Sequence, residues 1–255
     1  MQILISNDDG IQSPGIEALV KALYKEHTLV VAAPAEQQSA KAHAITVRNR
    51  LYVEEYLPLQ EKYGITALAV TGTPADAVKL YLEGIIGDAA AQRPDLVLSG
   101  INDGSNVGTD LLYSGTVGAA AEGFVHNIDS LAVSLDYDSE ATFDFVAEKV
   151  RERLPQLFPA HAPEGKKLIN INFPQKLAAD CKWIWCRQGI RDYCNAYQPQ
   201  YDEKGGLFYT VGGCPLDGGN EADTDVMTVA AGHVAVTPLQ LDKTDFAALE
   251  LGREL

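Results

Sequence analysis

The alternation of short apolar runs with amphipathic segments restricts the fold of this chain more than any other feature of its sequence. Residues 2–6 (QILIS), 29–33 (LVVAA) and 96–99 (LVLS) are short aliphatic runs, as expected of parallel strands buried on both faces. Between the first two runs, residues 14–23 place their apolar side chains on one face of a helix. This alternation is typical of doubly wound sheets, so the sequence predicts an α/β fold with a mostly parallel sheet.

Further elements continue the alternation and add local β structure. Thr73 and Pro74 supply an N-cap and a first-turn proline, and therefore predict the start of a helix. An alanine-rich helix is predicted to end near Phe124. The other predictions are a β-hairpin with strands at 45–47 and 51–53, strands at 67–70, 131–135 and 168–173, and helices at 75–82 and 143–154.

The pattern changes after residue 173. Predicted β segments, separated by long polar connections, then lie at 183–186, 207–211, 227–229 and 234–237. They are too few and too short to enclose a core of their own, and their unpaired edges need cover. We therefore predict a catalytic core at 1–173 and, at 174–255, a β-rich arm with a C-terminal tail at the interface of a homo-oligomer.

Two adjacent carboxylates, Asp8 and Asp9, follow the first predicted strand. The carboxyl edge of an open α/β sheet is where ligands bind, and Gly10 allows a turn on which both side chains converge. Two carboxylates held together repel one another unless a proton or a cation lies between them. A hard cation such as Mg²⁺ or Mn²⁺ fits this pair, although an Asp that caps the next helix would explain the same stretch.

Three other loops reach the same edge of the predicted sheet and carry oxygen donors. Ser39 follows the second predicted strand, and Asn102 lies in a glycine-rich stretch after a later one. Ser114, Gly115 and Thr116 open a helix, where hydroxyl and N–H groups can receive an anion. Each motif alone is typical of a turn or a helix cap. Together they indicate a metal beside an anion site, the arrangement that phosphoryl chemistry needs.

Charge and composition exclude several classes of partner. The net charge of −15 disfavours nucleic-acid polymers and anionic membranes, so a phosphate-bearing substrate must be attracted by a local site. We find neither a secretory signal nor an apolar run of membrane-spanning length, and we expect a cytoplasmic protein with no membrane partner. The four cysteines include no C-x-x-C pair, which favours free thiols over a zinc site.

Several motifs in this order resemble the successive signatures of the SurE family of metal-dependent 5′-nucleotidases: SNDDG, AEQQSAKAHAIT, TGTPADAV, SGINDGSNVG and YSGTVGAAAEG. The likeness extends from Ile3 to the C-terminal segment TDVMTVAAGHVAVTPL. It implies a Rossmann-like core, one divalent cation per subunit, and a C-terminal arm that mediates homodimers or homotetramers.

The resemblance also implies roles for individual residues. The implied cation ligands are Asp8, Asp9, Ser39 and Asn102, of which Asp8, Asp9 and Asn102 would form the catalytic centre. The residues implied to line the phosphate pocket are Asn106, Ser114, Gly115 and Thr116. One departure is visible, because Ala40-Lys41-Ala42 stands where the family has glycines. Alanine reaches positive φ less readily than glycine, so the path of this loop and the substrate preference can differ.

These features predict a phosphomonoesterase that hydrolyses nucleoside 5′-monophosphates to nucleoside and phosphate, with cleavage of 3′-monophosphates or short polyphosphate left open. We favour attack on phosphorus by a water that the metal activates. The alternative is an aspartyl-phosphate on Asp8 or Asp9, as in the haloacid-dehalogenase phosphatases with their D-x-D pattern. A nucleotide sensor without turnover would use the same fold. A Rossmann dehydrogenase is disfavoured because no G-x-G-x-x-G follows the first strand.

Five other side chains have candidate roles. His43 is a candidate for orienting the substrate, although a single loop histidine is more often structural. Tyr113 and Tyr193 are candidate contacts to the base. Trp183 and Trp185 are more typical of packing or of an interface.

Overall fold

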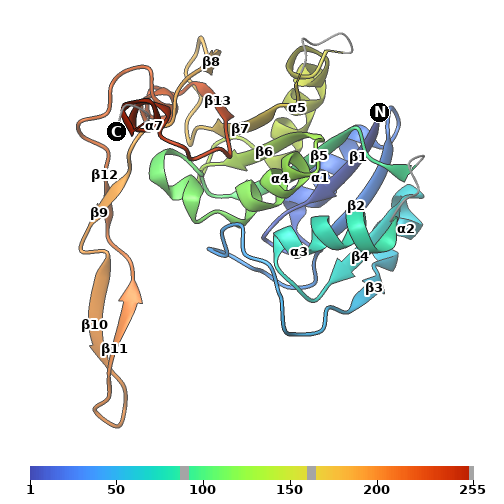
Figure 1. The fold of residues 1–255 in the computed structure, drawn as a ribbon, viewed down its shortest axis with the longest axis horizontal. Helices are drawn as coiled ribbons and strands as arrows, with labels where there is room; N and C mark the ends of the chain where they lie inside the picture. Colours follow the sequence, from blue (N-terminus) through green and yellow to red (C-terminus); the bar gives the residue numbers. More distant parts are fainter. Residues whose placement is uncertain (87–91, 160–164, 253–255) are drawn as a thin grey trace.

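In the computed structural model, which describes residues 1–86, 92–159 and 165–252, the chain forms a nine-stranded sheet with helices on both faces (Figure 1). From one edge to the other the strands are β3 (Val53–Glu55), β4 (Thr66–Val70), β2 (Thr28–Pro34), β1 (Gln2–Ser6), β5 (Leu96–Asp103), β6 (Asp129–Leu135), β7 (Leu168–Phe173), β13 (Val234–Leu239) and β8 (Trp183–Trp185). Neighbours from β4 to β7 pair in parallel, whereas β3 and β13 pair antiparallel with β4 and β7. The predicted α/β fold with a mostly parallel sheet is confirmed.

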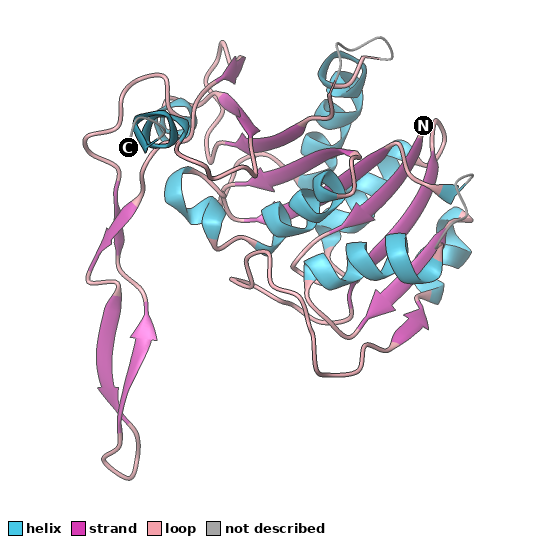
Figure 2. Ribbon diagram, viewed as in Figure 1, coloured by secondary structure: helices cyan, strands magenta, loops and turns pink. Residues whose placement is uncertain are grey.

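The helices cover the two faces of the sheet in separate groups (Figure 2). One face carries α1 (Pro14–Leu23), α2 (Leu57–Tyr63) and α5 (Phe143–Leu157), and the other carries α3 (Pro74–Lys79) and α4 (Gly115–Val125), which follows a 3₁₀ turn, η3 (Gly108–Leu112). Ile3 and Ile5 of β1 pack on the first face and Leu4 on the second. Because neighbouring side chains of a strand point to opposite faces, a strand covered on both sides is continuously apolar.

The strand order places β1 at a reversal point. From β1 the chain builds outward through β2 and β4 on one side and through β5, β6 and β7 on the other. In open α/β sheets the carboxyl ends of the two strands at such a reversal border a crevice for ligands. Asp8 follows the end of β1 as predicted, whereas Asn102, predicted to follow its strand, is the next-to-last residue of β5.

The hairpin predicted at 45–47 and 51–53 is wrong. Residues 45–52 form no strand, and β3 instead pairs with β4. The backbone N–H and the hydroxyl of Thr46 donate to the two carboxylate oxygens of Asp76 at 2.7 and 2.6 Å. This segment is therefore held by α3 and not by a partner strand. Alternating residue types form a strand only where a sheet receives them.

The strand predicted at 227–229 is also wrong, because these residues lie in α6 (Asp225–Ala230). Thr224 caps this helix by accepting a hydrogen bond from the Met227 N–H at 3.4 Å. Val226 and Val229, three positions apart, are buried together on one face of the helix. The helix predicted at 75–82 is α-helical only as far as Lys79 and continues as a π-helical turn, η1 (Leu80–Ile85).

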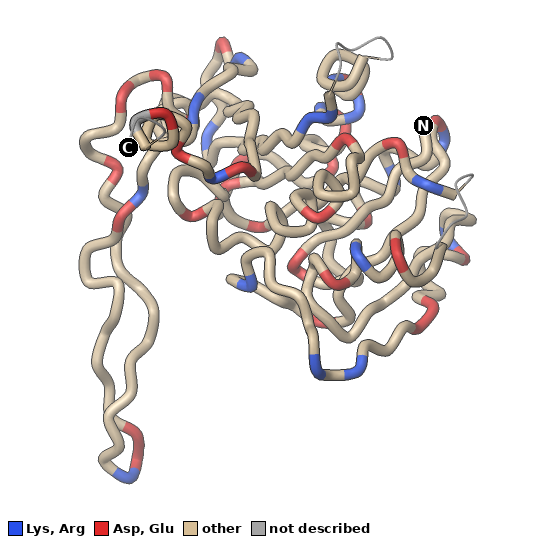
Figure 3. The backbone as a smooth tube through the Cα atoms, viewed as in Figure 1, with Lys and Arg blue, Asp and Glu red and all other residues tan. Residues whose placement is uncertain are grey.

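The last third of the chain is divided between the sheet and a projecting arm. β13 and β8 extend the sheet beyond β7, whereas the arm is a two-stranded ribbon. In the ribbon β9 (Asp192–Cys194) pairs with β12 (Cys214–Leu216), and β10 (Tyr197–Tyr201) pairs with β11 (Leu207–Val211). β10 and β11 project away from the body, and neither strand contains a charged residue (Figures 1 and 3). The division of the chain after residue 173 stays a prediction.

The described chain ends in a short helix, α7 (Phe246–Gly252). Within the three described ranges, no helix is both long enough and apolar enough to cross a membrane.

Candidate functional site

The predicted acid pair lies where the strand order reverses. Ser6 of β1 pairs with Ser99 of β5, so Asp8 and Asp9 leave the sheet beside the end of β5. The backbone N–H of Asp103 donates to Asp9 Oδ2 at 3.2 Å and joins the two segments directly. The structure thus brings the acid pair together with the segment that carries Asn102.

Asp8 packs against the N-terminus of α4. The residue is 4% exposed, and a Cβ added to Gly115 would lie 2.8 Å from the Asp8 Cβ, so this approach requires a glycine. The Thr116 hydroxyl donates to Asp8 Oδ1. Burial raises the pKa of Asp8, and hydrogen bonds from Thr116 and from the Gly115 N–H partly oppose the rise.

Asp9 lies beside Asp8 without a compensating cation. Burial, together with the negative charge of Asp8, raises the pKa of Asp9 to about 6. The ion pairs found among the described residues all involve other acids. Two desolvated carboxylates without a counter-charge are an unfavourable pair that a bound cation would stabilise.

Further oxygen donors come from the two loops that reach the acid pair. The Gln38 N–H donates to the backbone oxygen of Asp8 at 2.7 Å, and the exposed Ser39 is the next residue of that loop. The Asn102 side-chain amide donates to the Gly104 oxygen at 2.7 Å, which leaves its carbonyl oxygen for a ligand. No cluster of three His, Cys, Asp or Glu side chains suited to a metal occurs in the described residues, so the candidate donors here are of mixed type. The carboxylates of the acid pair, the Ser39 hydroxyl and the Asn102 amide are all oxygen donors, which is the kind of set that fits Mg²⁺ or Mn²⁺.

The predicted phosphate-binding residues lie in two different environments. Ser114 is the N-cap of α4 and accepts a hydrogen bond from the Val117 N–H at 3.1 Å, at a helix terminus that attracts anions. Asn106, by contrast, is 8% exposed, and its side-chain amide donates to Ser134 Oγ at 2.9 Å. The structure brings Gly115 and Thr116, directly after Ser114, to Asp8. The phosphate-binding roles of Asn106, Ser114, Gly115 and Thr116 stay predictions.

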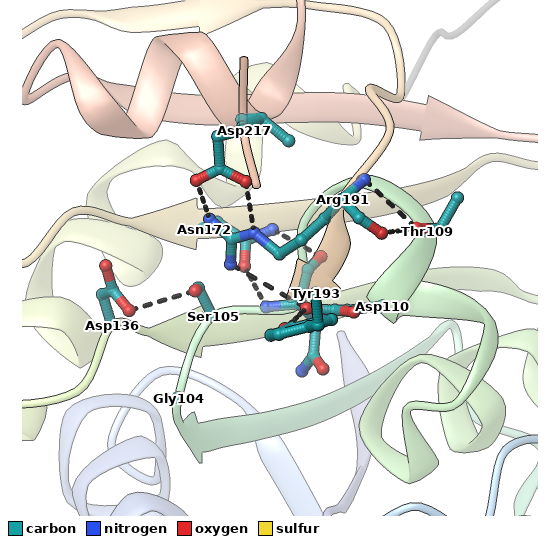
Figure 4. Close-up of polar contacts among 12 residues, drawn as sticks. Gly104, Ser105, Thr109, Asp110, Asp136, Asn172, Arg191, Tyr193 and Asp217 are labelled. Atoms are coloured by element: carbon teal, nitrogen blue, oxygen red, sulfur yellow. Dashed lines mark hydrogen bonds and ion pairs between the residues drawn. The ribbon is translucent and has the colours of Figure 1, made fainter. Parts of the chain in front are cut away.

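Arg191 and Tyr193, at the base of the arm, make hydrogen bonds to the loop that precedes α4 (Figure 4). The Arg191 N–H donates to Thr109 Oγ1 at 3.1 Å, and the Arg191 guanidinium pairs with Asp217 at 2.9 Å. The Tyr193 hydroxyl donates to Asp110, and burial together with this bond raises the pKa of Tyr193 to about 12. Tyr193 thus makes a structural contact with η3, the turn before α4, and its role as a base contact stays a prediction.

The loop after Ser39 contains two alanines in an unfavourable conformation. Ala40 and Ala42 have φ angles of 57° and 53°, in the left-handed region that favours glycine. The Ala42 N–H donates to the Tyr113 oxygen at 2.9 Å. A Cβ added to Gly118 would lie 2.2 Å from the Ala42 oxygen, so the loop lies directly against α4. These contacts hold the backbone in a conformation that alanine alone would avoid.

Glu122 is a neighbour of the site that the sequence analysis missed. This buried residue of α4 accepts hydrogen bonds from His43 Nε2 at 2.6 Å, Lys79 Nζ at 3.3 Å and His126 Nε2 at 3.1 Å. Burial acts to raise the pKa of Glu122, but the bonds from His43 and Lys79 outweigh it and lower the pKa to about 2. The available signal was a single acid within the small, apolar residues of this helix.

Tyr137 is a second residue that the sequence analysis missed. It follows β6 at the same edge, and a Cβ added to Gly104 would lie 2.5 Å from the Tyr137 Cζ. Partial burial, together with the charges of Asp103 and Asp9, raises the pKa of Tyr137. The residue is 63% exposed, and its ring lies against Gly104, in the segment that carries Asp103. Its position directly after a predicted strand was the signal that could have found it.

Comparisons with known proteins identify relatives of this chain. The family model described as Survival protein SurE matches residues 3–195. 5′-Nucleotidase SurE of Natranaerobius thermophilus is 40% identical, over 96% of this chain and 95% of that protein. 5′-Nucleotidase SurE of Pelotomaculum thermopropionicum is 41% identical, over 100% of this chain and 95% of that protein. The crystal structure of the SurE protein from Aquifex aeolicus matches with a TM-score of 0.80 at 34% identity, over 98% of this chain and 97% of that chain.

Proposed function

The chain belongs to the SurE family, and we propose that it is a 5′-nucleotidase that hydrolyses nucleoside 5′-monophosphates to nucleoside and phosphate. The observation that carries this proposal is the desolvated Asp8–Asp9 pair, without a counter-charge, beside the N-terminus of α4. The pair suits a cation and the helix terminus suits an anion, which are the two parts that hydrolysis of a phosphate ester needs. The names of the relatives supply the nucleotide as substrate class.

The residues that would hold one divalent cation per subunit, Mg²⁺ or Mn²⁺, are Asp8, Asp9, Ser39 and Asn102. A cation bound there supplies Lewis acidity that makes phosphorus more electrophilic. The N–H groups at the start of α4 and the Ser114 hydroxyl would donate to phosphate oxygens and orient the ester. The Thr116 hydroxyl keeps Asp8 in place by donating to its carboxylate.

Water is the favoured nucleophile in this proposal. Asp8 accepts a hydrogen bond from the Thr116 hydroxyl and Asp9 accepts one from the Asp103 N–H, so each carboxylate is held in place by the protein, which supports a ligand role over a nucleophilic one. Attack by water on phosphorus would displace the nucleoside 5′-oxygen directly. Attack by Asp8 or Asp9 would instead leave an aspartyl-phosphate on the protein.

Phosphate release across a substrate panel tests the proposal. The panel contains nucleoside 5′-monophosphates, the matching 3′-monophosphates and short polyphosphate, each with Mg²⁺, Mn²⁺ or a chelator. We expect release from the 5′-monophosphates with either metal and none with the chelator. Phosphate trapped on the protein by rapid acid quench would favour the aspartyl route. Tight nucleotide binding without turnover would indicate a sensor and overturn the proposal.

We also propose a homodimer or homotetramer in which a second copy covers the arm. Tyr197, Tyr201 and Val211 are 68%, 71% and 81% exposed on a ribbon that no other part of the described chain flanks (Figure 1). An isolated two-stranded ribbon is marginal in water, and an uncharged apolar edge favours association. We expect no nucleic-acid or membrane partner, given the net charge of −15.

A designed deletion separates the arm from the core. Removing 196–212 would join Asn195 to Gly213, which already have φ angles of 53° and 101°. Asn-Gly with positive φ at both positions is the sequence of a two-residue type I′ hairpin turn, so β9 and β12 would stay paired. Light scattering should show an oligomer for the intact chain and a folded monomer for the deletion. A monodisperse monomer for the intact chain would contradict this proposal.

A further inference from the structure

The neck of the arm, formed by β9 and β12, brings two cysteines face to face. In this antiparallel pair Cys194 lies directly opposite Cys214. Opposite residues in antiparallel strands have Cα atoms roughly 4.5–5.5 Å apart. A disulfide needs a Cα separation of roughly 4.4–6.8 Å, so the register by itself meets the distance requirement.

The register of the ribbon is consistent along its whole length. On the body side of the cysteines Tyr193 lies opposite Pro215, and toward the tip Tyr197 lies opposite Val211 in the same register. A slip by one residue would separate the cysteines and also turn the side chains of one strand to the other face. The hydrogen bonds that Arg191 and Tyr193 make to Thr109 and Asp110 oppose such a slip.

Both thiols at the neck are reachable by a small reagent. Cys214 is exposed and Cys194 is half-buried, with its Sγ 3.5 Å from the Cys214 backbone oxygen. Of the other two cysteines, Cys186 is buried and bonded to Thr237 at 3.4 Å, whereas Cys181 is half-buried like Cys194. Burial raises the pKa of both Cys186 and Cys181. Buried thiols with raised pKa values react slowly.

We propose that Cys194 and Cys214 are a reversible thiol–disulfide modification site whose reaction partner is a low-molecular-weight disulfide. The Cys214 thiolate attacks one sulfur of the small disulfide, forms a mixed disulfide and releases one small thiol. The Cys194 thiolate then attacks the Cys214 sulfur, closes the protein disulfide and releases the second small thiol. Each cysteine has lost its proton to water, the protein thiols are oxidised, and the small disulfide is reduced.

The bridge would act at the interruption of the ribbon. Asn195 and Gly213, the next residues toward the tip, both have positive φ, and they separate the neck from β10 and β11. The neck contacts η3 of the body through Tyr193 and Asp110. A bridge at Cys194–Cys214 would therefore lock the two strands at the base of the arm to each other beside this contact, and this inference does not depend on the proposed activity.

Trypsin makes the test direct, because each cysteine falls in its own peptide. The peptides that carry Cys181, Cys186, Cys194 and Cys214 are 177–182, 183–187, 192–204 and 205–243. The reduced full-length protein is treated with oxidised glutathione, its free thiols are alkylated, and it is digested without reductant. We expect peptides 192–204 and 205–243 to be linked, and the intact chain to be lighter by two hydrogen atoms.

Matched variants make the outcome decisive. In Cys194→Ser, Cys214 should accumulate as a mixed disulfide with glutathione, whereas the double variant Cys181→Ser and Cys186→Ser should form the bridge as the unaltered chain does. The two disulfides are compared by the ratio of reduced to oxidised glutathione at which each is reduced. This ratio should be at least about tenfold higher for the Cys194–Cys214 bridge than for the mixed disulfide of Cys194→Ser. Glutathione retained on both neck cysteines of the unaltered chain, a link to Cys186, or a link between two chains would overturn the proposal.

Discussion

Two buried acids, Asp8 against the first turn of α4 and Glu122 within that helix, have opposite electrostatic surroundings. At the first turn of the helix, Asp8 and Asp9 lie together without a cation, and the pKa of Asp9 is raised to about 6. Farther along the helix, Glu122 is bonded to His43, Lys79 and His126, and its pKa is lowered to about 2. Asp8 and Glu122 are each 4% exposed, so the opposite pKa shifts of these two acids come from their partners and not from exposure.

This contrast separates a binding site from a structural ion cluster. An acid whose cationic partners belong to the chain stabilises the fold without any ligand, and removing it leaves those partners unpaired. An acid pair without such partners destabilises the chain until a cation arrives, and such perturbed groups are typical of functional sites. Removing a charge from the acid pair should therefore raise the stability of the metal-free protein, whereas removing the charge of Glu122 should lower it.

The largest effect is expected at the acid pair. Asp8→Asn and Asp9→Asn each remove one charged ligand, so phosphate release should fall by on the order of 10³-fold. The metal-free proteins should be as stable as the unaltered chain or more stable, because the repulsion is relieved. Phosphate release at limiting metal and thermal unfolding with chelator measure the two effects.

Asp103→Asn is the matched control for the acid pair. Asp103 is exposed and contacts Asp9 through its backbone N–H, so its side chain is dispensable for that bond. Turnover of Asp103→Asn should stay close to that of the unaltered chain. Near-normal turnover of both Asp8→Asn and Asp9→Asn would remove the distinction between the two regions.

The second effect is on stability and appears at Glu122. The pKa of Glu122 is about 2 in the folded chain and 4.5 for an unperturbed glutamate. Its contribution to the free energy of unfolding is therefore complete above pH 4.5 and is lost as the pH falls toward 2. A shift of this size corresponds to about 3 kcal/mol. Glu122→Gln should lower the free energy of unfolding by about that amount at pH 7 and flatten its pH dependence below about pH 5.

Urea unfolding between pH 7 and pH 3 measures this difference. Glu83→Gln is the control, because Glu83 is exposed and also pairs with Lys79, at 2.9 Å. It should change the free energy of unfolding by less than about 0.5 kcal/mol. If Glu122→Gln and Glu83→Gln were equally mild, Glu122 would not be the structural counterpart of the acid pair.

The two regions also differ in how far the sequence predicts them. The acid pair follows an aliphatic strand, Asn102 lies at the end of another, and glycines come shortly after both, so local signals place them at one edge of the sheet. Glu122 is 79 residues from His43 and 43 from Lys79, and only tertiary packing brings the three together. Only the contact with His126, four residues later at the end of the same helix, follows a spacing rule.

The same limit explains the errors in the fold. The parallel core was predictable because each strand is recognised from its own residues. The hairpin failed because Thr46 bonds to Asp76, 30 residues away, in place of a partner strand. The helix α6 was missed because β-branched residues outweighed the capping Thr224 in the prediction.

A smaller effect should sharpen the account of Asp8. Thr116→Val keeps the volume but removes the hydroxyl that donates to Asp8, so this buried carboxylate loses a hydrogen bond at a cost of about 1–3 kcal/mol. The affinity for Mg²⁺ or Mn²⁺, followed by calorimetry, should fall together with kcat/KM. The fall in kcat/KM should be by the same factor for every phosphate ester. Thr116→Ser keeps the donor and should restore most of both. A loss confined to one base would mean that Thr116 contacts the nucleoside and not the acid pair.

The smallest effect concerns the loop that links the two regions, since it carries both Ser39 and His43. Ala42 has a φ of 53°, a conformation that costs an L residue roughly 1–2 kcal/mol, whereas glycine in the unfolded chain costs roughly 0.5–1 kcal/mol. Ala42→Gly should therefore stabilise the protein by about 0.5–1 kcal/mol and raise the melting temperature by about 2 °C. Asn127→Gly is the control, because Asn127 has a φ of 58° but asparagine tolerates this region, so its gain should be smaller. Loss of stability in Ala42→Gly, seen by calorimetry, would mean that the alanine side chain contributes contacts that outweigh its backbone strain.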